Sequence, residues 1–562
     1  MKVVIVGGVA GGATAAARIR RLDEHAEIVV FERSGYISYA NCGLPYYIGG
    51  VIEDPEDLTL QTPESFYRRF HIHMKVHHEV VAIHPDRKTV SVKNLETGAV
   101  FEESYEKLLL SPGAKPVWPN LPGMESKKLF TLRTVEDTFR IKEFVDVNKP
   151  KSAVMVGGGF IGLEVAENLR ELGIEVTIVQ RPKQLMNPFD ADMASFIHNE
   201  VRKHGVKLAL GYSVEGFVEN GTGIDVLLKE NAPLHTDMVV LAIGVTPESA
   251  LAREAGLALG IKNSILVNDR METSIPDIYA VGDAVQVKHY VTGEGTLIAL
   301  AGPANKQGRI AADNICGGDS RYLGSQGSSV IKVFNMTAAA TGLNETNARK
   351  SGLEADTVIL SPMSHAGYYP GGKVMTMKVV FEKETYRLLG AQIVGYDGVD
   401  KRIDVLATAI HAGLRATELK DLDLAYAPPY SSAKDPVNMA GFMIDNISKG
   451  LKQWHLADAG KLPRDGSVTL LDTRTAGEYS RGHIEGFRNI PVDELRERIA
   501  ELEPNKPVYL ICQSGLRSYI ATRILEGYGF EAYNFAGGFR FYDAVMNDRS
   551  LVEKAMSCGM DT

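Results

Sequence analysis

The alternation of apolar and polar runs along the chain predicts strands and helices in turn. Residues 2–6 (KVVIV) form a continuous apolar run typical of a buried strand, a helical segment follows, and residues 28–32 (IVVFE) begin the next strand. This order returns about 150 residues later, where strands at 153–156 and 175–179 flank a helix that Gly173 ends. Short apolar strands that alternate with helices are typical of parallel sheets. The pattern therefore predicts two Rossmann-like α/β domains.

Two further regions follow. From about 327 to 449, strands such as 388–395 mix with helical segments, which predicts an α+β domain. A linker at 450–463 precedes strands at 468–472 and 508–511, which predict a separate α/β module. The chain as a whole is therefore expected to be of the α/β class.

Composition excludes several classes of protein. The net charge of −9, from 61 basic and 70 acidic residues, disfavours a nucleic-acid partner. The chain enters a strand at once and has no apolar run long enough for a membrane span, so we expect neither a signal peptide nor membrane association. Four cysteines in 562 residues, no two of them close in sequence, predict no disulfide framework and no metal site. These features indicate a reducing cytoplasm.

The first strand leads into a glycine-rich turn. Such turns let backbone N–H groups approach a pyrophosphate at the start of a helix. Glu32, 20 residues past the turn, stands where an acid holds a ribose hydroxyl, and we assign the adjacent Arg33 to the same site. Valine occupies the usual middle glycine position. The turn residues assigned to the dinucleotide are Gly7, Gly8, Val9, Ala10, Gly11 and Gly12.

The second strand–turn–helix unit carries a full G-x-G-x-x-G motif. Two dinucleotide turns in one chain indicate a flavin and a nicotinamide. Gln180 stands where an acid would select NADH, and Arg181 beside it could bind a 2′-phosphate, so NADH and NADPH both stay open. The residues of this turn assigned to the nicotinamide cofactor are Gly157, Gly159, Phe160, Ile161 and Gly162.

Cys42 follows the first βαβ unit, where its thiol would face a bound dinucleotide. The alternative interpretation is a small buried apolar residue, as most free cysteines are. Dithiol reductases place a second cysteine five positions later, but here that position is Tyr47. A lone redox cysteine must cycle through a mixed disulfide, a persulfide or a sulfenic acid. We expect Cys42 to open a short helix over 42–48, whose N-terminus would favour the thiolate.

Two later motifs resemble the two-dinucleotide-binding flavoprotein disulfide reductases. Residues 273–283 (TSIPDIYAVGD) resemble their flavin-ribityl motif, and residues 108–114 (LLLSPGA) resemble their strand that links the flavin and nicotinamide domains. The resemblance implies an FAD domain at 1–111 and 245–326, an NAD(P)H domain at 112–244, and a dimerisation domain at 327–449. It adds further residues to the cofactor sites, namely Ser111, Gly113, Gly244, Gly282 and Asp283.

Residues 1 to about 445 resemble the coenzyme A-disulfide reductases and the related NADH-dependent persulfide reductases. The shared motifs are the Val-Ala-Gly-Gly turn, the Ser-Tyr-x-Asn-Cys-Gly-Leu-Pro-Tyr run around Cys42, and the Tyr-Ala-Pro-Pro-Tyr run at 426–430. Peroxidases and oxidases of the same family cycle through sulfenic acid and carry a histidine where this chain has Ala10. The resemblance therefore favours coenzyme A chemistry at Cys42.

Coenzyme A is a polyanion and needs cations. Thr14, Arg18 and Arg21 share one helix face by their spacing, although a solvated basic face has the same pattern. By resemblance the coenzyme A contacts also include Ser38, Asn41, Asn305 and Lys434, with Arg69 or His71 as a further match.

Two tyrosine runs lie in the expected dimerisation domain. A phenol can protonate a leaving thiolate, although such residues can also be packing aromatics. The resemblance assigns Tyr368 and Tyr426, with Tyr430 as the alternate, to the active site around Cys42 of the other subunit of a homodimer. Tyr426 is placed beside the cofactor as well. Phe160 and Glu164 match family positions beside the nicotinamide.

The C-terminal module, 464–562, resembles a rhodanese. Its candidate loop runs six residues from Cys512 to Arg517, and related phosphatase loops are one residue longer. The loop amides, with Arg517, would stabilise the anionic terminal sulfur of a persulfide on Cys512. Cys316 is expected to be buried filler, and Cys558 to lie in the C-terminal tail.

These elements predict an enzyme that passes electrons from NAD(P)H through FAD to Cys42. Cys42 would reduce coenzyme A persulfide, polysulfide or disulfide, while Cys512 carries sulfane sulfur, and sulfide and coenzyme A would be released. Two alternatives are a coenzyme A-disulfide reductase proper and a sulfurtransferase with a redox-sensing flavoprotein half.

Overall fold

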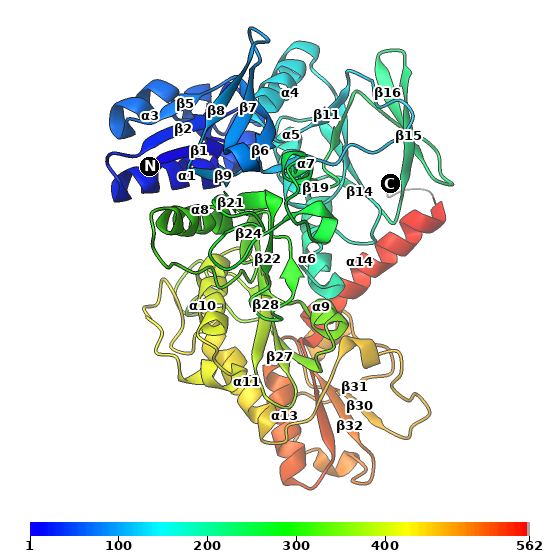
Figure 1. The fold of residues 1–562 in the computed structure, drawn as a ribbon. Coiled ribbons are helices and arrows are strands. Elements are labelled where there is room, and N and C mark those ends of the chain that lie inside the picture. The colour runs from blue at the N-terminus through cyan, green and yellow to red at the C-terminus, as the bar shows by residue number, and fades with distance from the viewer. Residues whose placement is uncertain (559–562) are drawn as a thin grey trace. The chain divides into compact units, whose positions relative to one another are not determined.

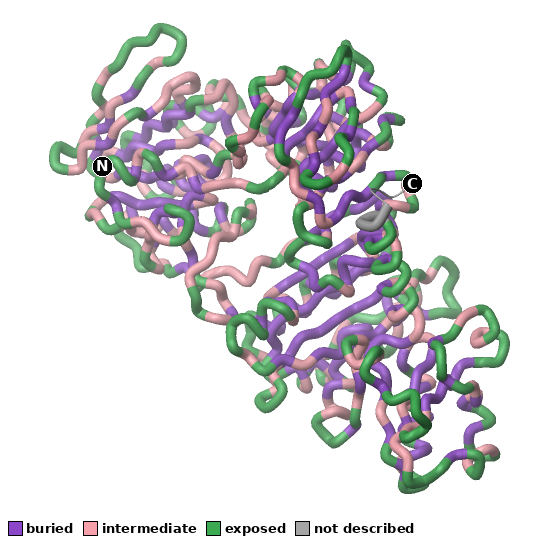
Figure 2. Tube along the Cα trace, turned by 90° about the vertical axis from the view of Figure 1, so that its right-hand side faces the viewer, coloured by how far each residue is buried: buried purple, intermediate pink, exposed green. Residues whose placement is uncertain are grey.

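The computed structural model describes residues 1–558, with side chains to Lys554, and the chain divides into two compact units (Figure 1). The first unit comprises Met1–Lys183 and Gly205–Gly327. The second comprises Gln184–His204 and the chain from Ser328 onward. In both units the buried stretches of the chain concentrate in the strands of the sheets (Figure 2).

The first unit holds two parallel sheets. The flavin-side sheet has the order β21-β9-β1-β2-β5. Its members are β1 (Lys2–Val6), β2 (Glu27–Phe31), β5 (His73–Lys75), β9 (Lys107–Leu110) and β21 (Ile278–Ala280). The sheet is parallel throughout, and its strands, apart from the edge strand β5, are mostly apolar and buried. Helices α1 (Ala10–Leu22) and α8 (Ala301–Ile315) pack against each other beside it.

The nicotinamide-side sheet repeats this plan with the order β11-β18-β12-β13-β14. Its strands are β11 (Leu129–Thr131), β12 (Ser152–Val156), β13 (Glu175–Gln180), β14 (Lys207–Leu210) and β18 (Met238–Leu241), and its helices are α4 (Val135–Asn148) and α5 (Phe160–Glu171). The two predicted Rossmann-like units are therefore confirmed.

The first unit also contains smaller strands and helices. Two three-stranded meanders are formed by β6 (His78–His84), β7 (Thr89–Asn94) and β8 (Val100–Ser104), and by β15 (Val214–Asn220), β16 (Gly223–Leu228) and β17 (Leu234–Thr236). The remaining strands are β3 (Ile37–Tyr39), β4 (Thr59–Gln61), β10 (Ala114–Pro116), β19 (Val245–Pro247), β20 (Ile265–Leu266), β22 (Val285–Lys288) and β23 (Gly295–Thr296). The short helices are α2 (Leu44–Ile48), α3 (Pro63–Phe70) and α7 (Ala250–Glu254).

The second unit begins with an antiparallel sheet, ordered β24-β25-β28-β27-β26. Its strands are β24 (Ser329–Val333), β25 (Met336–Gly342), β26 (Ala355–Leu360), β27 (Met375–Glu382) and β28 (Leu388–Gly395). The helices of this region are α6 (Ala191–Lys203), α9 (Glu345–Lys350), α10 (Val399–His411) and α11 (Pro436–Ser448). This is the predicted α+β domain.

Helix α6 connects two strands of the nicotinamide-side sheet in sequence, yet it packs with the second unit. Lys378 of β27, only 1% exposed, pairs with Asp190 at 3.2 Å, with Asp192 at 2.8 Å and with Glu345 at 2.8 Å. A buried ammonium needs compensating carboxylates, and removal of the Lys378 ammonium would leave buried carboxylate charge uncompensated. The predicted domain limits 112–244 therefore enclose a segment, Gln184–His204, that the second unit holds.

A third parallel sheet, ordered β29-β33-β32-β30-β31, forms the C-terminal module. It consists of β29 (Gln453–Trp454), β30 (Thr469–Asp472), β31 (Arg488–Asn489), β32 (Val508–Ile511) and β33 (Ala532–Phe535), with α12 (Ala476–Ser480), α13 (Leu516–Gly527) and α14 (Gly538–Cys558). Trp454 falls inside the predicted linker but is buried, packs on Phe535 and donates from its indole nitrogen to the Leu510 carbonyl at 3.1 Å. The linker is shorter than predicted because this tryptophan is part of the module's core.

Candidate functional site

The flavin-side turn is shaped for close approach of a phosphate. Gly7 has φ +95°, and a Cβ on it would overlap the Ser111 carbonyl oxygen, while a Cβ on Gly12 would overlap the Gly7 carbonyl oxygen. Glu32 is buried at the end of β2 and accepts from the Gly8 N–H at 2.8 Å and from the Ser34 N–H at 2.9 Å. Such a side-chain-free cradle with an anchored acid fits a dinucleotide.

The nicotinamide-side turn is built in the same way, except that an uncharged glutamine accepts its N–H hydrogen bond in place of a glutamate. The Gly158 N–H donates to Gln180 Oε1 at 3.0 Å, so Gln180 takes the place that Glu32 has in the first turn. A Cβ on Gly162 would overlap the Gly157 carbonyl oxygen, whereas a Cβ on Gly159 would meet no atom within 4 Å. The turn is tight on its inner side and open where a ligand's phosphates approach. It fits a second dinucleotide.

Asp283 of the flavin-ribityl motif has a partner that the sequence did not predict. Arg133 Nη2 donates to Asp283 Oδ2 at 2.7 Å, across 150 residues of chain. On the other side the Gly282 N–H donates to Gln307 Oε1 at 2.7 Å. These two bonds fix the backbone and the carboxylate at the carboxyl ends of β9 and β21, where Ser111 also lies.

Cys42 lies in a 3₁₀ turn, Asn41–Gly43, just ahead of helix α2. The expected helix from Cys42 onward is wrong, because α2 begins at Leu44. Pro45 stands in the first turn of α2, the one helical place where a proline costs no backbone hydrogen bond, and it sets the helix start. Cys42 therefore lies in the turn that precedes α2 and is not part of that helix.

The thiol of Cys42 is exposed, and its surroundings oppose ionisation. Burial by neighbouring protein, with the negative charge of Glu164, raises the pKa of the Cys42 thiol. This direction is opposite to that expected from a helix N-terminus. Glu164 lies on α5, which packs against α2, and burial together with Glu167 raises the pKa of its carboxyl to about 7. The charge on Glu164 therefore influences the protonation of the Cys42 thiol.

Tyr47, at the position of the second cysteine of dithiol enzymes, is a packing residue. Its ring meets the ring of Phe139 on α4 edge-on, with centroids 5.6 Å apart. Asn41, a predicted coenzyme A contact, has a buried side-chain oxygen with no hydrogen-bond partner among the described residues. An orphaned acceptor next to Cys42 is a place where a ligand donor fits.

The other predicted coenzyme A residues divide between the units. On α1, Thr14 Oγ1 donates to Asn305 Oδ1 of α8, so these two are brought together. Arg18 Nε donates to Asp313 Oδ1 at 2.7 Å, a partner not predicted from the sequence, which makes this face more than a solvated basic stripe. Arg21, Arg69 and His71 are exposed. Ser38 lies in the first unit with them, its N–H donating to Gly8 O, and Lys434 is an exposed residue of the second unit.

Tyr368 and Tyr426 meet, as their joint assignment requires. Their hydroxyl oxygens lie 2.6 Å apart in the second unit, with the side chains 76% and 45% exposed. The hydrogen bond to Tyr368 raises the pKa of the Tyr426 phenol. Tyr430 is 73% exposed, and its backbone carbonyl accepts from Arg402.

A buried ion pair fixes the loop that carries these residues. Arg402 is 1% exposed and bonds Asp435 Oδ2 at 3.0 Å, while Ser431 Oγ donates to the same oxygen at 2.7 Å. Arg402 also donates to the Ser364 carbonyl at 3.0 Å. No sequence motif marks Arg402, because Ser364 lies 38 residues before it and Asp435 lies 33 residues after it.

Cys512 forms a second, separate thiol site. It is fully buried at the end of β32, and its Sγ accepts from the Gly515 N–H at 3.1 Å and from Ser518 Oγ at 3.2 Å. Both contacts place donors on the sulfur, as an anionic sulfur requires. The loop amides were predicted, whereas Ser518 was not.

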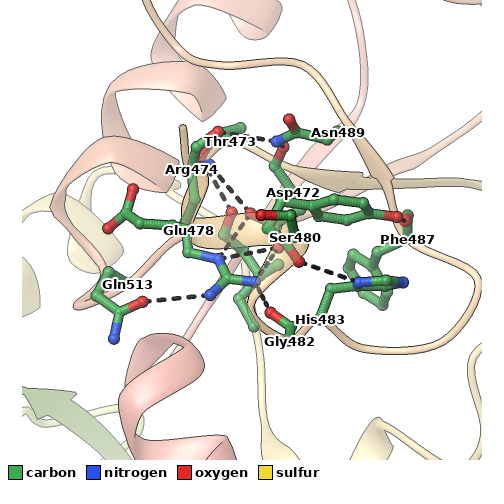
Figure 3. Close-up of polar contacts among 12 residues, drawn as sticks. Asp472, Thr473, Arg474, Glu478, Ser480, Gly482, His483, Phe487, Asn489 and Gln513 are labelled. Atoms are coloured by element: carbon green, nitrogen blue, oxygen red, sulfur yellow. Dashed lines mark hydrogen bonds and ion pairs between the residues drawn. The ribbon is translucent and has the colours of Figure 1, made fainter. Parts of the chain in front are cut away.

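Two arginines support the Cys512 loop. Arg517 pairs with Glu478 through two bonds, at 2.6 and 2.7 Å. Arg474 is buried against Asp472, donates to the Gly482 carbonyl at 2.7 Å and reaches Gln513 Oε1 at 3.3 Å (Figure 3). Figure 3 shows the Arg474 guanidinium at the centre of this network, so that it holds the second residue of the loop. The sequence signal for Glu478 is its position three residues after Thr475, which is the spacing of a helix capping box.

Comparison with known proteins decides the family. Residues 1–308 match the model of the pyridine nucleotide-disulphide oxidoreductases, residues 328–436 match their dimerisation domain, and residues 455–544 match the rhodanese-like domain. The chain belongs to the pyridine nucleotide-disulphide oxidoreductase family.

Individual relatives agree. A coenzyme A disulfide reductase of Staphylococcus aureus (strain JH9) is 38% identical over 442 residues, which cover 78% of this chain and 99% of the relative. The crystal structure of reduced Bacillus anthracis CoADR-RHD is 49% identical, with a TM-score of 0.95 over 98% of both chains. A NAD-dependent persulfide reductase from A. fulgidus is 36% identical, with a TM-score of 0.90 over 96% of this chain and 100% of the other.

As a pyridine nucleotide-disulphide oxidoreductase, the chain is an enzyme that uses FAD and a nicotinamide cofactor. The fold class expected from the sequence is confirmed, including the rhodanese-like domain. No helix in the described part of the chain is long and apolar enough to cross a membrane. Cys316 is half-buried at the end of α8 and packs against the flavin-side core, as a filler residue would, and Cys558 is the last residue of α14, its side chain outside the described part.

Proposed function

We propose that the chain is an NAD(P)H-dependent reductase of coenzyme A persulfide, polysulfide or disulfide, and that its rhodanese-like domain carries sulfane sulfur on Cys512. The observation that carries this proposal is the exposed, single Cys42 beside a flavin-side turn, with Tyr47 where a partner cysteine would be. The names of the Staphylococcus aureus and A. fulgidus relatives support the two substrate classes. The rhodanese-like domain favours the persulfide.

FAD and NAD(P)H, when bound, supply the electron pair that restores the Cys42 thiolate. Gly7, Gly12 and Glu32 are the residues that would hold the flavin, and Gly157, Gly162 and Gln180 those that would hold the nicotinamide. In the substrate step, Cys42 Sγ attacks the coenzyme A sulfur of the persulfide. The S–S bond breaks, hydrosulfide leaves with the bonding electrons, and a mixed disulfide of Cys42 and coenzyme A forms. Its reduction by two electrons releases the coenzyme A thiolate.

The tyrosine pair supplies the proton for this release. We assign Tyr426 of the partner subunit as the acid, with the partner subunit's Tyr368 holding its hydroxyl, because a phenol can protonate a leaving thiolate. The assignment requires a homodimer, which the match to a dimerisation domain supports. Lys434 would reach coenzyme A in the same assembly. We place the enzyme in a reducing cytoplasm, where its cysteines stay free.

Steady-state NADH and NADPH oxidation with coenzyme A persulfide, coenzyme A disulfide and hydrogen peroxide tests the proposal. We expect the highest kcat/KM for the persulfide and a much lower value for peroxide, because Ala10 replaces the histidine of the peroxidases. A higher kcat/KM for the disulfide would favour a coenzyme A-disulfide reductase proper. Sulfur transfer without flavin turnover would instead make the chain a sulfurtransferase with a redox-sensing half.

Mixed dimers test the shared site. A subunit with Cys42→Ser and a subunit with Tyr426→Phe, combined in one dimer, leave one site with both groups intact. We expect such mixed dimers to recover about half of the wild-type activity, as subunit counting predicts. Activity no higher than that of the two parent variants would show that the tyrosine does not act across the interface.

A further inference from the structure

The charge of Arg517, in the Cys512 loop, is neutralised by Glu478. Both terminal nitrogens of Arg517 donate to the two carboxylate oxygens of Glu478, at 2.6 and 2.7 Å, a bidentate geometry. Glu478 is itself fixed, because it also accepts from the Thr475 N–H at 3.0 Å as the capping partner of α12. The hydrogen bond from Arg517 lowers the pKa of the Glu478 carboxyl to about 2, so the pair stays ionised at neutral pH. Arg517 therefore brings no net positive charge to the mouth of the loop.

The second arginine at the loop is neutralised as well. Arg474 is 2% exposed, and Asp472, fully buried, receives three of its hydrogen bonds. Its guanidinium also stacks on the Phe539 ring, 3.9 Å from the centroid. The Arg540 backbone N–H donates to the Gln513 carbonyl, and its side chain lines a cavity with Glu200 and Tyr396.

Two apolar side chains are exposed at the start of α13, the helix that continues the loop. Leu516, a residue of the loop itself, and Ile520, four residues later, are 59% and 39% exposed. The donors that reach Sγ are a backbone amide and a hydroxyl, both uncharged. A donor molecule that enters this mouth meets hydrocarbon and compensated charges.

We propose that this arrangement selects the sulfur donor, and that Glu478 is the residue that sets the selection. The module takes sulfane sulfur from thiol persulfides, in which a single charge lies at the reacting end, or from polysulfides, whose two charges lie at opposite ends of a sulfur chain. It discriminates against thiosulfate, a compact dianion that needs a cation to replace its water of hydration. The phosphates of a coenzyme A persulfide do not enter this argument, because they lie on the order of 20 Å from its sulfur by extended-chain reasoning.

The transfer step balances without a further reactant. Cys512 Sγ attacks the terminal sulfur of the donor, the donor's S–S bond breaks, and the donor thiolate leaves with the bonding electrons. Cys512 then holds a persulfide whose terminal sulfur is anionic. The inference rests on the sulfur-carrying role of Cys512 in the proposed function and adds the donor class to it.

The test uses the full-length protein and mass spectrometry of the Cys512 peptide. Loading is followed in time with thiosulfate, inorganic polysulfide or coenzyme A persulfide, for the wild type, Glu478→Gln and the control Glu503→Gln. In Glu478→Gln the new side chain can still accept the capping hydrogen bond from Thr475, but it carries no charge. Glu503 pairs with Lys506 on the surface, ahead of β32, whereas Cys512 follows that strand, so the control removes one charge at the opposite end of the sheet.

We expect the wild type to load from persulfide and polysulfide at least roughly tenfold faster than from thiosulfate, about 1.4 kcal/mol. Glu478→Gln should raise the rate of loading from thiosulfate roughly tenfold, because the positive charge of Arg517 is then no longer neutralised by a carboxylate. The rate of loading from persulfide should change by less than about twofold. Glu503→Gln should change neither. Coenzyme A disulfide reduction through Cys42 reports that each variant is folded.

Two outcomes would overturn the inference. One is wild-type loading from thiosulfate as fast as from persulfide, a result that needs no variant. The other is a folded Glu478→Gln whose thiosulfate rate is unchanged. If no donor loads Cys512 at all, the carrier role in the proposed function fails, and that result is distinct from loading without discrimination.

Discussion

Cys42 and Cys512 are both nucleophiles in the proposed chemistry, but the protein surrounds them in opposite ways. Cys512 is fully buried and its sulfur accepts two hydrogen bonds from its own loop. Cys42 is exposed, accepts no hydrogen bond from the described residues, and has its thiol pKa raised by burial and by Glu164. The proposed carrier site thus takes its hydrogen-bond donors from one module, whereas the proposed redox site relies on bound groups and on a second subunit.

The largest expected effect is the loss of persulfide reduction when Cys42, and not Cys512, is replaced. Cys42→Ser should lower NADH-dependent persulfide reduction by roughly 10³-fold or more, as loss of a nucleophile does, and should leave FAD bound. Steady-state rates and the flavin absorbance spectrum measure both. Cys316→Ser, which changes a half-buried cysteine without an assigned role, is the matched control. Turnover of Cys42→Ser close to that of the wild type would remove Cys42 from the mechanism.

The next effect falls on the carrier alone. Cys512→Ser should abolish sulfur uptake by the rhodanese-like domain, because the serine hydroxyl is a poor nucleophile for sulfur. Reduction of coenzyme A disulfide should stay within about twofold of the wild type, since Cys42 is intact. Peptide mass spectrometry and steady-state kinetics read the two functions separately. Sulfur found on Cys42 but never on Cys512 in the wild type would contradict the carrier role.

The tyrosine pair should have a smaller effect on the redox site. Tyr426→Phe should lower kcat by roughly 10²-fold, in the range of a lost general acid. Tyr368→Phe should do likewise, and the double variant should be little worse than either, because the two hydroxyls share one hydrogen bond. Tyr430→Phe is the control, since its hydroxyl is not part of the pair. If Tyr430→Phe lowered kcat more than Tyr426→Phe does, Tyr430 would replace Tyr426 as the assigned acid.

The smallest effect concerns the acid beside Cys42. Glu164 has a carboxyl pKa of about 7, so its charge develops as the pH rises through neutrality and opposes the Cys42 thiolate. Glu164→Gln removes this repulsion, so the pH profile of Cys42 alkylation should move to lower pH, with roughly threefold faster alkylation at pH 8. The control is Glu171→Gln, an exposed residue at the end of the same helix. An unchanged profile would show that Glu164 does not act on the thiol.

What could be predicted from the sequence was local. The glycine turns, the strands around them and the Cys512 loop each lie within a short run of residues, and their spacing carries the geometry. The ion pairs that orient the sites could not be predicted in the same way. Arg133 and Asp283 are 150 residues apart, and Glu478 and Arg517 are 39 apart, so only the folded chain joins them.

Local rules also explain the two errors of detail. The predicted helix start at Cys42 is two residues too early, because Pro45 in the first turn favours a start at Leu44. The predicted linker includes Trp454, because a single tryptophan in a polar stretch gives no periodic signal. The packing of α6 with the second unit had no local signature either, since the buried Lys378 and its three carboxylates come from segments far apart in sequence.

Helix α14 makes the rhodanese-like domain difficult to detach. It begins beside the Cys512 loop, where the Phe539 N–H donates to the Cys512 carbonyl, and further along it Asp548 bonds both His198 and Arg202 of α6. His198 and Asp548 are almost fully buried by this contact.

The Staphylococcus aureus relative matches over 442 residues, which make up 99% of its length but 78% of this chain. In this chain the contact with α14 buries one face of α6. A chain shortened before the rhodanese-like domain would leave His198 and Arg202 without their aspartate and would expose the Phe196 ring, which now stacks on Phe541 of α14.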